Sequence, residues 1–289
     1  MANSHDTRFQ LASVSKQFTA AAIMLLADRA ALSVQDPVLS WLGRCPPSWE
    51  SMTIHHLLVH TSGIGHWDDM PQIDGTAAME PARELAIVQG RALRSEPGAQ
   101  WHYSSPGYFL LAHIVQRAAA RPYATFLAEE IFGPLGMTAT FAGNAGGRDR
   151  VATGYSHGQP VTPYELELTN MGAGDVWSTT GDVAKWDAAL AARSLLSETS
   201  WQAMLARHAA IDDLAEGASP VRTDGYGYGW FTGSVSGLPV RYHPGDNPGF
   251  HALNGWIPDL AARVIIMSNE QAASIPELAG EILASVLAS

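Results

Sequence analysis

The segment Ser13-Val14-Ser15-Lys16 holds the first residue types in the chain that could carry out covalent chemistry. Lys16 is one of two lysines, and residues three apart in a helix lie on one face, so the Ser13 hydroxyl and the Lys16 amine should be neighbours. A serine hydroxyl becomes a good nucleophile when a base takes its proton, and a lysine can be that base if burial or nearby positive potential lowers its pKa. The N–H groups at a helix start supply that potential and can also stabilise an oxyanion. By itself, however, the spacing is weak evidence and favours an ordinary surface lysine.

Two later segments complete a pattern with the first. Tyr103-Ser104-Ser105 precedes a predicted helix, and His243-Pro244-Gly245 ends a predicted strand. The order Ser-x-x-Lys, Tyr-Ser-x and His-x-Gly resembles that of the serine β-lactamase and penicillin-binding protein superfamily. More narrowly, it resembles the class C-like branch, which includes D-alanyl-D-alanine carboxypeptidases, D-aminopeptidases and related esterases. Matching segments at residues 9–19, 56–64, 134–137 and 172–179 extend the resemblance over nearly the whole chain.

The resemblance implies a serine hydrolase that works without a metal or another cofactor. In that scheme Ser13 attacks a carbonyl to give an acyl-enzyme, Lys16 and Tyr103 relay the protons, and water releases the product. The backbone N–H groups of Ser13 and Asp246 form the oxyanion hole, where each donor is worth about 3 kcal/mol in comparable sites. The scheme also implies three substrate-binding residues, which are Ser105, His243 and Gly245.

The departures from the family pattern concern the substrate. Ser105 stands where the family often has asparagine, and a hydroxyl cannot make the pair of contacts that an amide makes. His243 stands where a lysine often clamps a substrate carboxylate, so this cation is absent unless His243 is protonated. An esterase or a relaxed amidase is therefore predicted. The alternatives are binding of a β-lactam or peptidoglycan fragment with stalled acylation, weak carboxypeptidase or β-lactamase activity, and acyl transfer to an alcohol or amine.

Three other motifs compete with this interpretation. Residues 154–158 match the G-x-S-x-G nucleophile elbow, but the flanking glycines and prolines favour a loop over the strand and helix that an elbow needs. His56 and His60 have metal-ligand spacing, yet a carboxylate at helical spacing is missing, so structural hydrogen bonding is favoured. The glycines of residues 225–229 alternate with aromatic residues instead of forming the G-x-G-x-x-G pattern of a dinucleotide site. They predict a strand with close backbone approach. Four tryptophans either line an acyl pocket or pack in the core: Trp67, Trp101, Trp177 and Trp230.

Composition restricts the class of protein. The chain has 289 residues, of which 46% are hydrophobic and 16% charged, against roughly 25% charged in average proteins, so a large core is expected. A net charge of −11 repels polyanions and disfavours nucleic-acid binding. The single cysteine, Cys45, excludes an internal disulfide. Neither an export signal nor a membrane-spanning segment is recognisable, so we expect a cytoplasmic protein. The resemblance implies that its partner is a small ester or amide substrate.

The apolar patterns predict how these residues are positioned. Apolar residues with helical spacing after residue 13 predict a helix with one buried stripe that ends near residue 31. Residues 36–215 form a mainly helical lobe, with helices predicted at 53–59, 81–93, 106–119, 123–131, 180–192 and 197–206. Residues 1–35 and 216–289 form an α/β lobe, with three or four antiparallel strands and a closing helix over 276–287.

The expected fold is thus α/β (α+β) and β-lactamase-like, with an antiparallel sheet flanked by helices. The relatives carry a helix and two strands before the nucleophile, whereas this sequence has 12 residues there. The strand predicted over residues 262–268 would then end the sheet, and an uncovered edge is adhesive. We therefore expect a homodimer through this edge, or a rearranged N-terminus that covers it.

Overall fold

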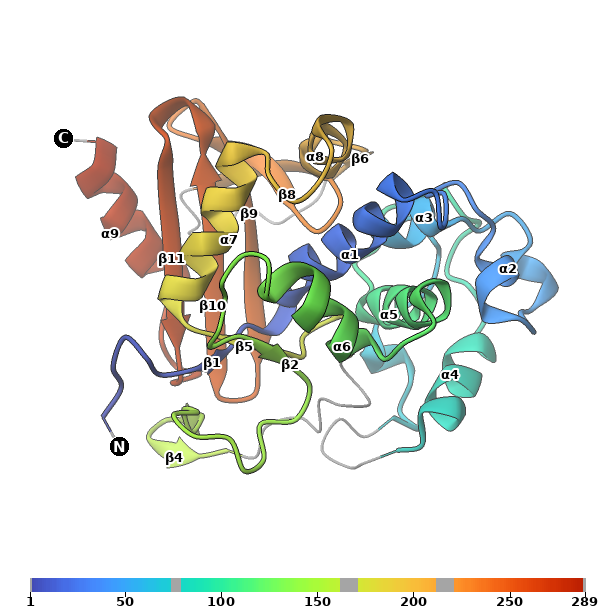
Figure 1. Ribbon diagram of the computed structural model, residues 1–289, viewed down its shortest axis with the longest axis horizontal. Coiled ribbons are helices and arrows are strands. Elements are labelled where there is room, and N and C mark those ends of the chain that lie inside the picture. Colours follow the sequence, from blue (N-terminus) through green and yellow to red (C-terminus); the bar gives the residue numbers. More distant parts are fainter. Residues whose placement is uncertain (1, 74–78, 162–170, 212–220, 288–289) are drawn as a thin grey trace.

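The structure is a computed structural model that describes residues 2–73, 79–161, 171–211 and 221–287. Figure 1 shows an antiparallel sheet with helices packed on it at one end of the molecule and a group of helices at the other end. Helix α1 (Lys16–Asp28) runs from the sheet into this helical group. No helix in the described ranges is long and apolar enough to span a membrane.

The main sheet is a meander of six antiparallel strands in the order β11-β10-β9-β8-β7-β6. Residues 236 and 237 connect β8 to β9, and both have positive φ (49° and 81°), which is the turn geometry that suits the twist of a hairpin. The strands are β6 (Ala209–Ala210), β7 (Val221–Tyr226), β8 (Phe231–Val235), β9 (Leu238–Asn247), β10 (Phe250–Ile257) and β11 (Ala262–Ser268).

Helices cover both faces of β11. Val264 and Ile266 pack in one cluster with Ile275 of α9 (Ile275–Leu287), while Ile265 and Met267 pack against the main core. Helix α7 (Thr180–Ala192) contacts β11 as well. Burial on both faces therefore explains why these four successive residues of β11 are all apolar. Among the described strands, β11 pairs only with β10, so it forms one edge of the sheet.

Helix α1 differs from its prediction. It is preceded by a short 3-10 turn (Ala12–Ser15), and its residues from Lys16 to Leu26 are all buried rather than forming one apolar stripe. The cause is its place in the fold, since it packs against α5 (Ser105–Ala119), α6 (Tyr123–Leu127) and α8 (Glu198–Leu205). An enclosed helix is buried on every side, and here the enclosed residues include the polar Lys16, Gln17 and Thr19 at its N-terminal end.

The remaining elements are short. The helical group also contains α2 (Val38–Leu42), α3 (Ile54–Leu58) and α4 (Pro81–Gln89), with a π-helical turn at Ala128–Phe132. Further 3-10 turns span Pro47–Trp49, Trp67–Asp69 and Pro258–Leu260. A small sheet joins β1 (Phe9–Gln10), β5 (Val176–Ser178) and β2 (Phe141–Ala142), and a hairpin joins β3 (Tyr155–Ser156) to β4 (Gln159–Pro160).

The two-lobe division remains a prediction, and its boundary at residue 215 lies outside the described residues. Strand β6 and helix α7 precede that boundary, yet β6 belongs to the main sheet and α7 packs on it.

Candidate active site

Ser13 lies in the 3-10 turn that leads into α1. The preceding residue, Ala12, has a left-handed backbone (φ 47°), which is strained for a residue with a Cβ. The turn is held on β5 from both ends, because Leu11 N donates to Val176 O (2.8 Å) and Val176 N donates to Ser15 Oγ (3.0 Å). The short strand β5 therefore fixes the position of the serine.

Lys16 begins α1 and is completely buried. Its Nζ lies 2.9 Å from Ser13 Oγ, 3.2 Å from Ser105 Oγ and 2.8 Å from Ala173 O. Burial lowers the pKa of Lys16 well below its usual value, while the Asp175 carboxylate acts in the opposite direction. A lysine in this environment gives up its proton far more readily than one in water and can act as a base.

Tyr103 lies beside the amine and the serine. Lys16 Nζ is 4.9 Å from the centre of the Tyr103 ring. Burial raises the pKa of Tyr103, opposed by a hydrogen bond with the Ser13 side chain, so the phenol remains a proton donor at neutral pH. The loop that carries it enters α5, where Gly107 N donates to the capping Ser104 hydroxyl (3.1 Å).

Strand β9 runs close to the nucleophile turn. A Cβ added to Gly245 would lie 2.2 Å from Leu11 O and 3.1 Å from Ser13 N, so only glycine allows this approach. Ser13, Gly245 and Asp246 all line one cavity. The assignment of the Ser13 and Asp246 N–H groups to an oxyanion hole remains a prediction that this geometry permits.

His243 is fully buried, and both of its ring nitrogens have partners. Nδ1 is 2.6 Å from Pro244 O, which can only accept, so Nδ1 carries the hydrogen and Nε2 accepts from the Tyr226 hydroxyl (2.9 Å). Burial, together with the charge of Lys16, lowers the pKa of His243 to about 3. His243 is therefore neutral and supplies no cation to bind a carboxylate.

The cavity has a volume of about 760 Å³ and is mostly apolar. Its described lining includes two carboxylates, Asp68 and Asp246, but no lysine or arginine. Ser105 lines it too. Two of the four candidate tryptophans, Trp67 and Trp101, lie in its wall, whereas the other two pack in the core. The other large apolar lining residues are Phe231, Tyr242, Leu253 and Ile275.

Two residues near Lys16 were not anticipated as members of the site. His66 lines the cavity, and its Nε2 is 3.2 Å from Ser105 Oγ. Asp175 is buried, and burial raises its pKa to about 7. His66 follows the matched segment 56–64, and Asp175 lies within the matched segment 172–179, but neither spacing indicates a contact with the Ser-x-x-Lys segment.

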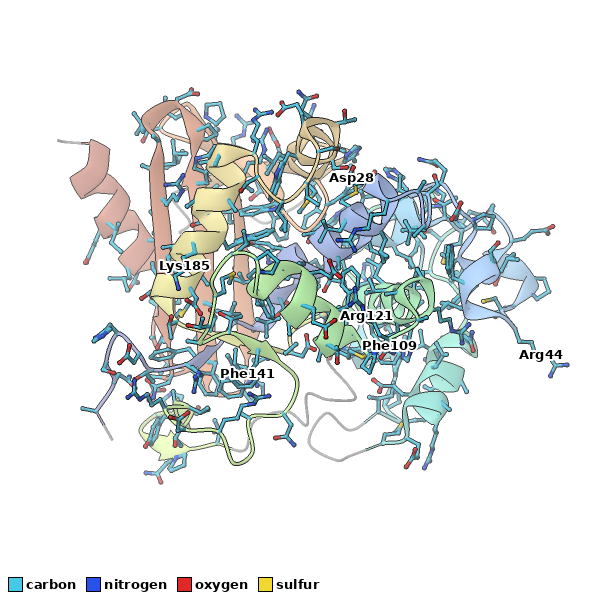
Figure 2. The ribbon with its side chains drawn as sticks, in the orientation of Figure 1. Asp28, Arg44, Phe109, Arg121, Phe141 and Lys185 are labelled. Atoms are coloured by element: carbon cyan, nitrogen blue, oxygen red, sulfur yellow. The ribbon has the colours of Figure 1, made fainter. Side chains whose placement is uncertain are left out.

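The competing motifs lie elsewhere. Ser156 belongs to the β3–β4 hairpin, is not followed by a helix and does not line the cavity, as the loop prediction requires. His60 Nδ1 accepts from Ser104 N (3.1 Å), and His55 Nδ1 is 2.8 Å from the Tyr228 hydroxyl. In the described part of the chain, no three histidine, cysteine or acidic side chains form a metal-binding group. The second lysine, Lys185, lies half-exposed on α7 (Figure 2).

Comparison with known proteins places these features in a family. The model of the Beta-lactamase family matches residues 1–286. PbpX of Bacillus subtilis, named as a penicillin-binding protein, is 31% identical over 93% of this chain, and esterase EstB of Burkholderia gladioli is 35% identical over 54%. The chain spans 64% of PbpX and 43% of EstB, less than two thirds of either. The octameric penicillin-binding protein homologue from Pyrococcus abyssi superposes with a TM-score of 0.85 at 25% identity, over 99% of this chain and 67% of that one.

Proposed function

This chain belongs to the Beta-lactamase family, and from that premise we propose that it is a serine hydrolase that cleaves an ester or amide through an acyl-enzyme on Ser13. The observation that carries the proposal is the 2.9 Å contact between Ser13 Oγ and the amine of a fully buried lysine. A buried amine with a lowered pKa is the base that a serine nucleophile needs.

The proposed acylation moves one proton and exchanges one bond. Neutral Lys16 takes the hydroxyl proton of Ser13 as Oγ bonds to the carbonyl carbon, and the N–H groups of Ser13 and Asp246 hold the developing oxyanion. The bond to the leaving group then breaks, and Tyr103, which burial keeps protonated, gives its proton to the leaving group while Lys16 passes the Ser13 proton on to Tyr103, so both groups regain their starting state. In deacylation Lys16 takes a proton from water as the water oxygen bonds to the acyl carbon. The bond from that carbon to Ser13 Oγ then breaks, and Oγ takes the proton back.

The proposed substrate is a neutral ester with an apolar acyl group. The described cavity wall is mostly apolar, carries Asp68 and Asp246 but no lysine or arginine, and includes a neutral His243. A substrate carboxylate would therefore meet repulsion instead of a clamp. The name of the relative EstB is consistent with an esterase. Stalled acylation, carboxypeptidase or β-lactamase activity and acyl transfer are the alternatives.

The test combines turnover with labelling. We expect the protein to hydrolyse p-nitrophenyl butyrate at least about tenfold more efficiently than the p-nitrophenyl hemisuccinate that carries a carboxylate. Intact mass should show one fluorophosphonate adduct on the wild type and on Ser156→Ala, and none on Ser13→Ala. A stable acyl adduct without turnover would support the stalled binder, and a new ester formed from an added alcohol would support transfer. An unlabelled wild type, or equal labelling of Ser13→Ala, would refute the assignment of the nucleophile.

We also propose a homodimer in which a second copy covers the free edge of β11. This strand ends the sheet in the described part of the chain, and helices already cover both of its faces, so only its edge is open for pairing. One structural relative, the homologue from Pyrococcus abyssi, is octameric. A cytoplasmic location remains a prediction, which cell fractionation tests.

A further inference from the structure

The Ser105 hydroxyl lies between two nitrogen atoms of the site. Its Oγ is 3.2 Å from Lys16 Nζ and 3.2 Å from His66 Nε2. Ser105 is the first residue of α5 and is buried, whereas His66 comes from the loop before the 3-10 turn Trp67–Asp69. Lys16, Ser105 and His66 thus form a continuous chain of possible hydrogen bonds that begins at Ser13.

The number of donors and acceptors determines which group donates in each hydrogen bond of this series. A neutral lysine amine has two N–H donors and one lone pair. Ala173 O, 2.8 Å from Nζ, can only accept and therefore takes one N–H. If Ser105 gives its own hydrogen to His66, its oxygen can accept the second N–H. Both N–H groups of Lys16 are then used, so its lone pair remains. Of the three groups in contact with Nζ, only the Ser13 hydroxyl is still without a bond to it.

We propose that His66 is a positioning residue that acts through Ser105 to keep the lone pair of Lys16 directed at Ser13. The proposal rests on the proposed function, in which Lys16 is the base. It requires His66 Nε2 to accept, so the ring hydrogen must be on Nδ1, and the Asp69 N–H of the Trp67–Asp69 turn must donate to His66 O (3.0 Å) instead of to the ring. In a doubly protonated ring Nε2 would donate to Ser105, whose hydrogen could then turn to the Lys16 lone pair and divert it from the nucleophile.

The surroundings of His66 favour the neutral ring, the only form that can accept at Nε2, at neutral pH. Burial lowers the pKa of His66, as an ammonium at Lys16 would too, and the Asp68 and Asp69 carboxylates oppose this effect. The Asp69 carboxylate is itself engaged, because it accepts from His66 N (3.1 Å) and from the Arg94 guanidinium. The other titratable groups that face the ring are His60, His102 and Tyr103, the last of which stacks on it at 6.0 Å.

The experiment is a double-mutant cycle on the rate of Ser13 acylation by a fluorophosphonate and on kcat/KM for p-nitrophenyl butyrate. We expect Ser105→Ala and His66→Phe each to slow both rates about tenfold or more, which is less than the roughly 10²–10⁴-fold of groups that transfer the proton themselves. The double variant should be no slower than the slower single variant, because both changes break one chain. His66→Gln, whose amide oxygen can accept from Ser105, should stay within about threefold of the wild type and should lose the His66 contribution to the acidic limb of the pH profile.

Several results would overturn the proposal. Multiplying losses in the double variant would mean that the two residues act independently, and wild-type rates in His66→Phe would mean that the ring plays no part. If Ser105→Ala fails to fold, as judged by circular dichroism, the comparison of His66→Gln with His66→Phe tests the proposal instead. An equal loss of rate in both variants would refute the hydrogen-bond link from His66 to Lys16. His102→Gln, a neighbouring histidine without a bond to Ser105, is the matched control and should keep the wild-type rate. A wild type that is not labelled at Ser13 would instead refute the proposed function.

Discussion

At the scale of single residues, the site depends on how firmly Lys16 holds its proton. Burial favours the neutral amine, and the Asp175 carboxylate favours the ammonium. The sequence predicted Ser13, Lys16, Tyr103 and Ser105 as site residues because their order and spacing match a family pattern, and the structure brings them together around Lys16. His66 and Asp175 could not be predicted in this way, since they come from other segments of the chain and only folding brings them to Lys16.

Asp175→Asn should shift the acidic limb of kcat/KM to lower pH. Removing the carboxylate takes away the charge that stabilises the ammonium, so the pKa of Lys16 falls and the neutral base persists at lower pH. Burial raises the pKa of Asp175 to about 7, so the change in rate should be largest where this carboxylate is ionised in the wild type.

The check is a pH–rate profile with p-nitrophenyl butyrate. Asp187→Asn is the matched control, because Asp187 is also buried with its pKa raised to about 7, but it is hydrogen-bonded to Asn254 and not coupled to Lys16. An acidic limb that moves to higher pH in Asp175→Asn would contradict the assigned role of the carboxylate.

At the scale of elements, the approach of β9 to the nucleophile turn depends on one glycine. Gly245→Ala would place a Cβ 2.2 Å from Leu11 O, a backbone atom that is fixed by β5, so β9 must move away from Ser13. We expect kcat/KM to fall about 10²-fold or more, the scale of losing one oxyanion donor. Gly255→Ala on the neighbouring strand β10, where the nearest atom would be 3.7 Å away, should keep most of the activity. Equal activity in the two variants would refute the close-approach argument.

Helix α4 buries a carboxyl group that has no hydrogen-bond partner among the described residues. Both carboxyl oxygens of Glu84 lack one, and burial raises the pKa of Glu84 from 4.5 to about 8. Between these values the unfolded chain releases a proton that the folded protein keeps, so the contribution of Glu84 to the free energy of unfolding falls as the pH rises.

Glu84→Gln should therefore stabilise the protein more at pH 8.5 than at pH 5.5, by roughly 1–3 kcal/mol at the higher pH, the usual cost of burying an unpaired polar group. Urea unfolding at the two pH values measures the effect. Glu80→Gln, at the exposed start of the same helix, should change stability little at either pH. A gain for Glu84→Gln that is the same at both pH values would disprove the buried-carboxyl explanation.

The sequence predicted the elements whose patterns are local. The strand predicted over residues 262–268 and the helix predicted over residues 180–192 both form with those bounds. Strands β1, β2 and β5 were missed because they have two or three residues each and are stabilised by distant partners. The sequence predicted one buried stripe on α1, whereas the helix is buried on all sides. No local pattern indicates this enclosure, because it depends on the helices that pack around α1.

At the scale of the whole molecule, the edge of β11 predicts an assembly. Sedimentation velocity should show a dimer, and the backbone amides of residues 262–268 should exchange more slowly with solvent at high protein concentration than at low concentration. The strand β8, paired on both sides within one chain, serves as the internal reference. A strictly monomeric profile with unchanged exchange at the β11 edge would reject the dimer.

The three contacts of Lys16 also restrict how a substrate can arrive. The amine touches the nucleophile turn, the first residue of α5 and the Ala173 carbonyl, so three separate stretches of chain meet at one nitrogen atom. A hinge motion that parted the helices from the sheet would pull that nitrogen away from Ser13, which it deprotonates in the proposed mechanism. Catalysis is therefore expected to proceed in a preassembled site, with substrates diffusing in through the mouth of the cavity and no cycle of opening and closure between turnovers.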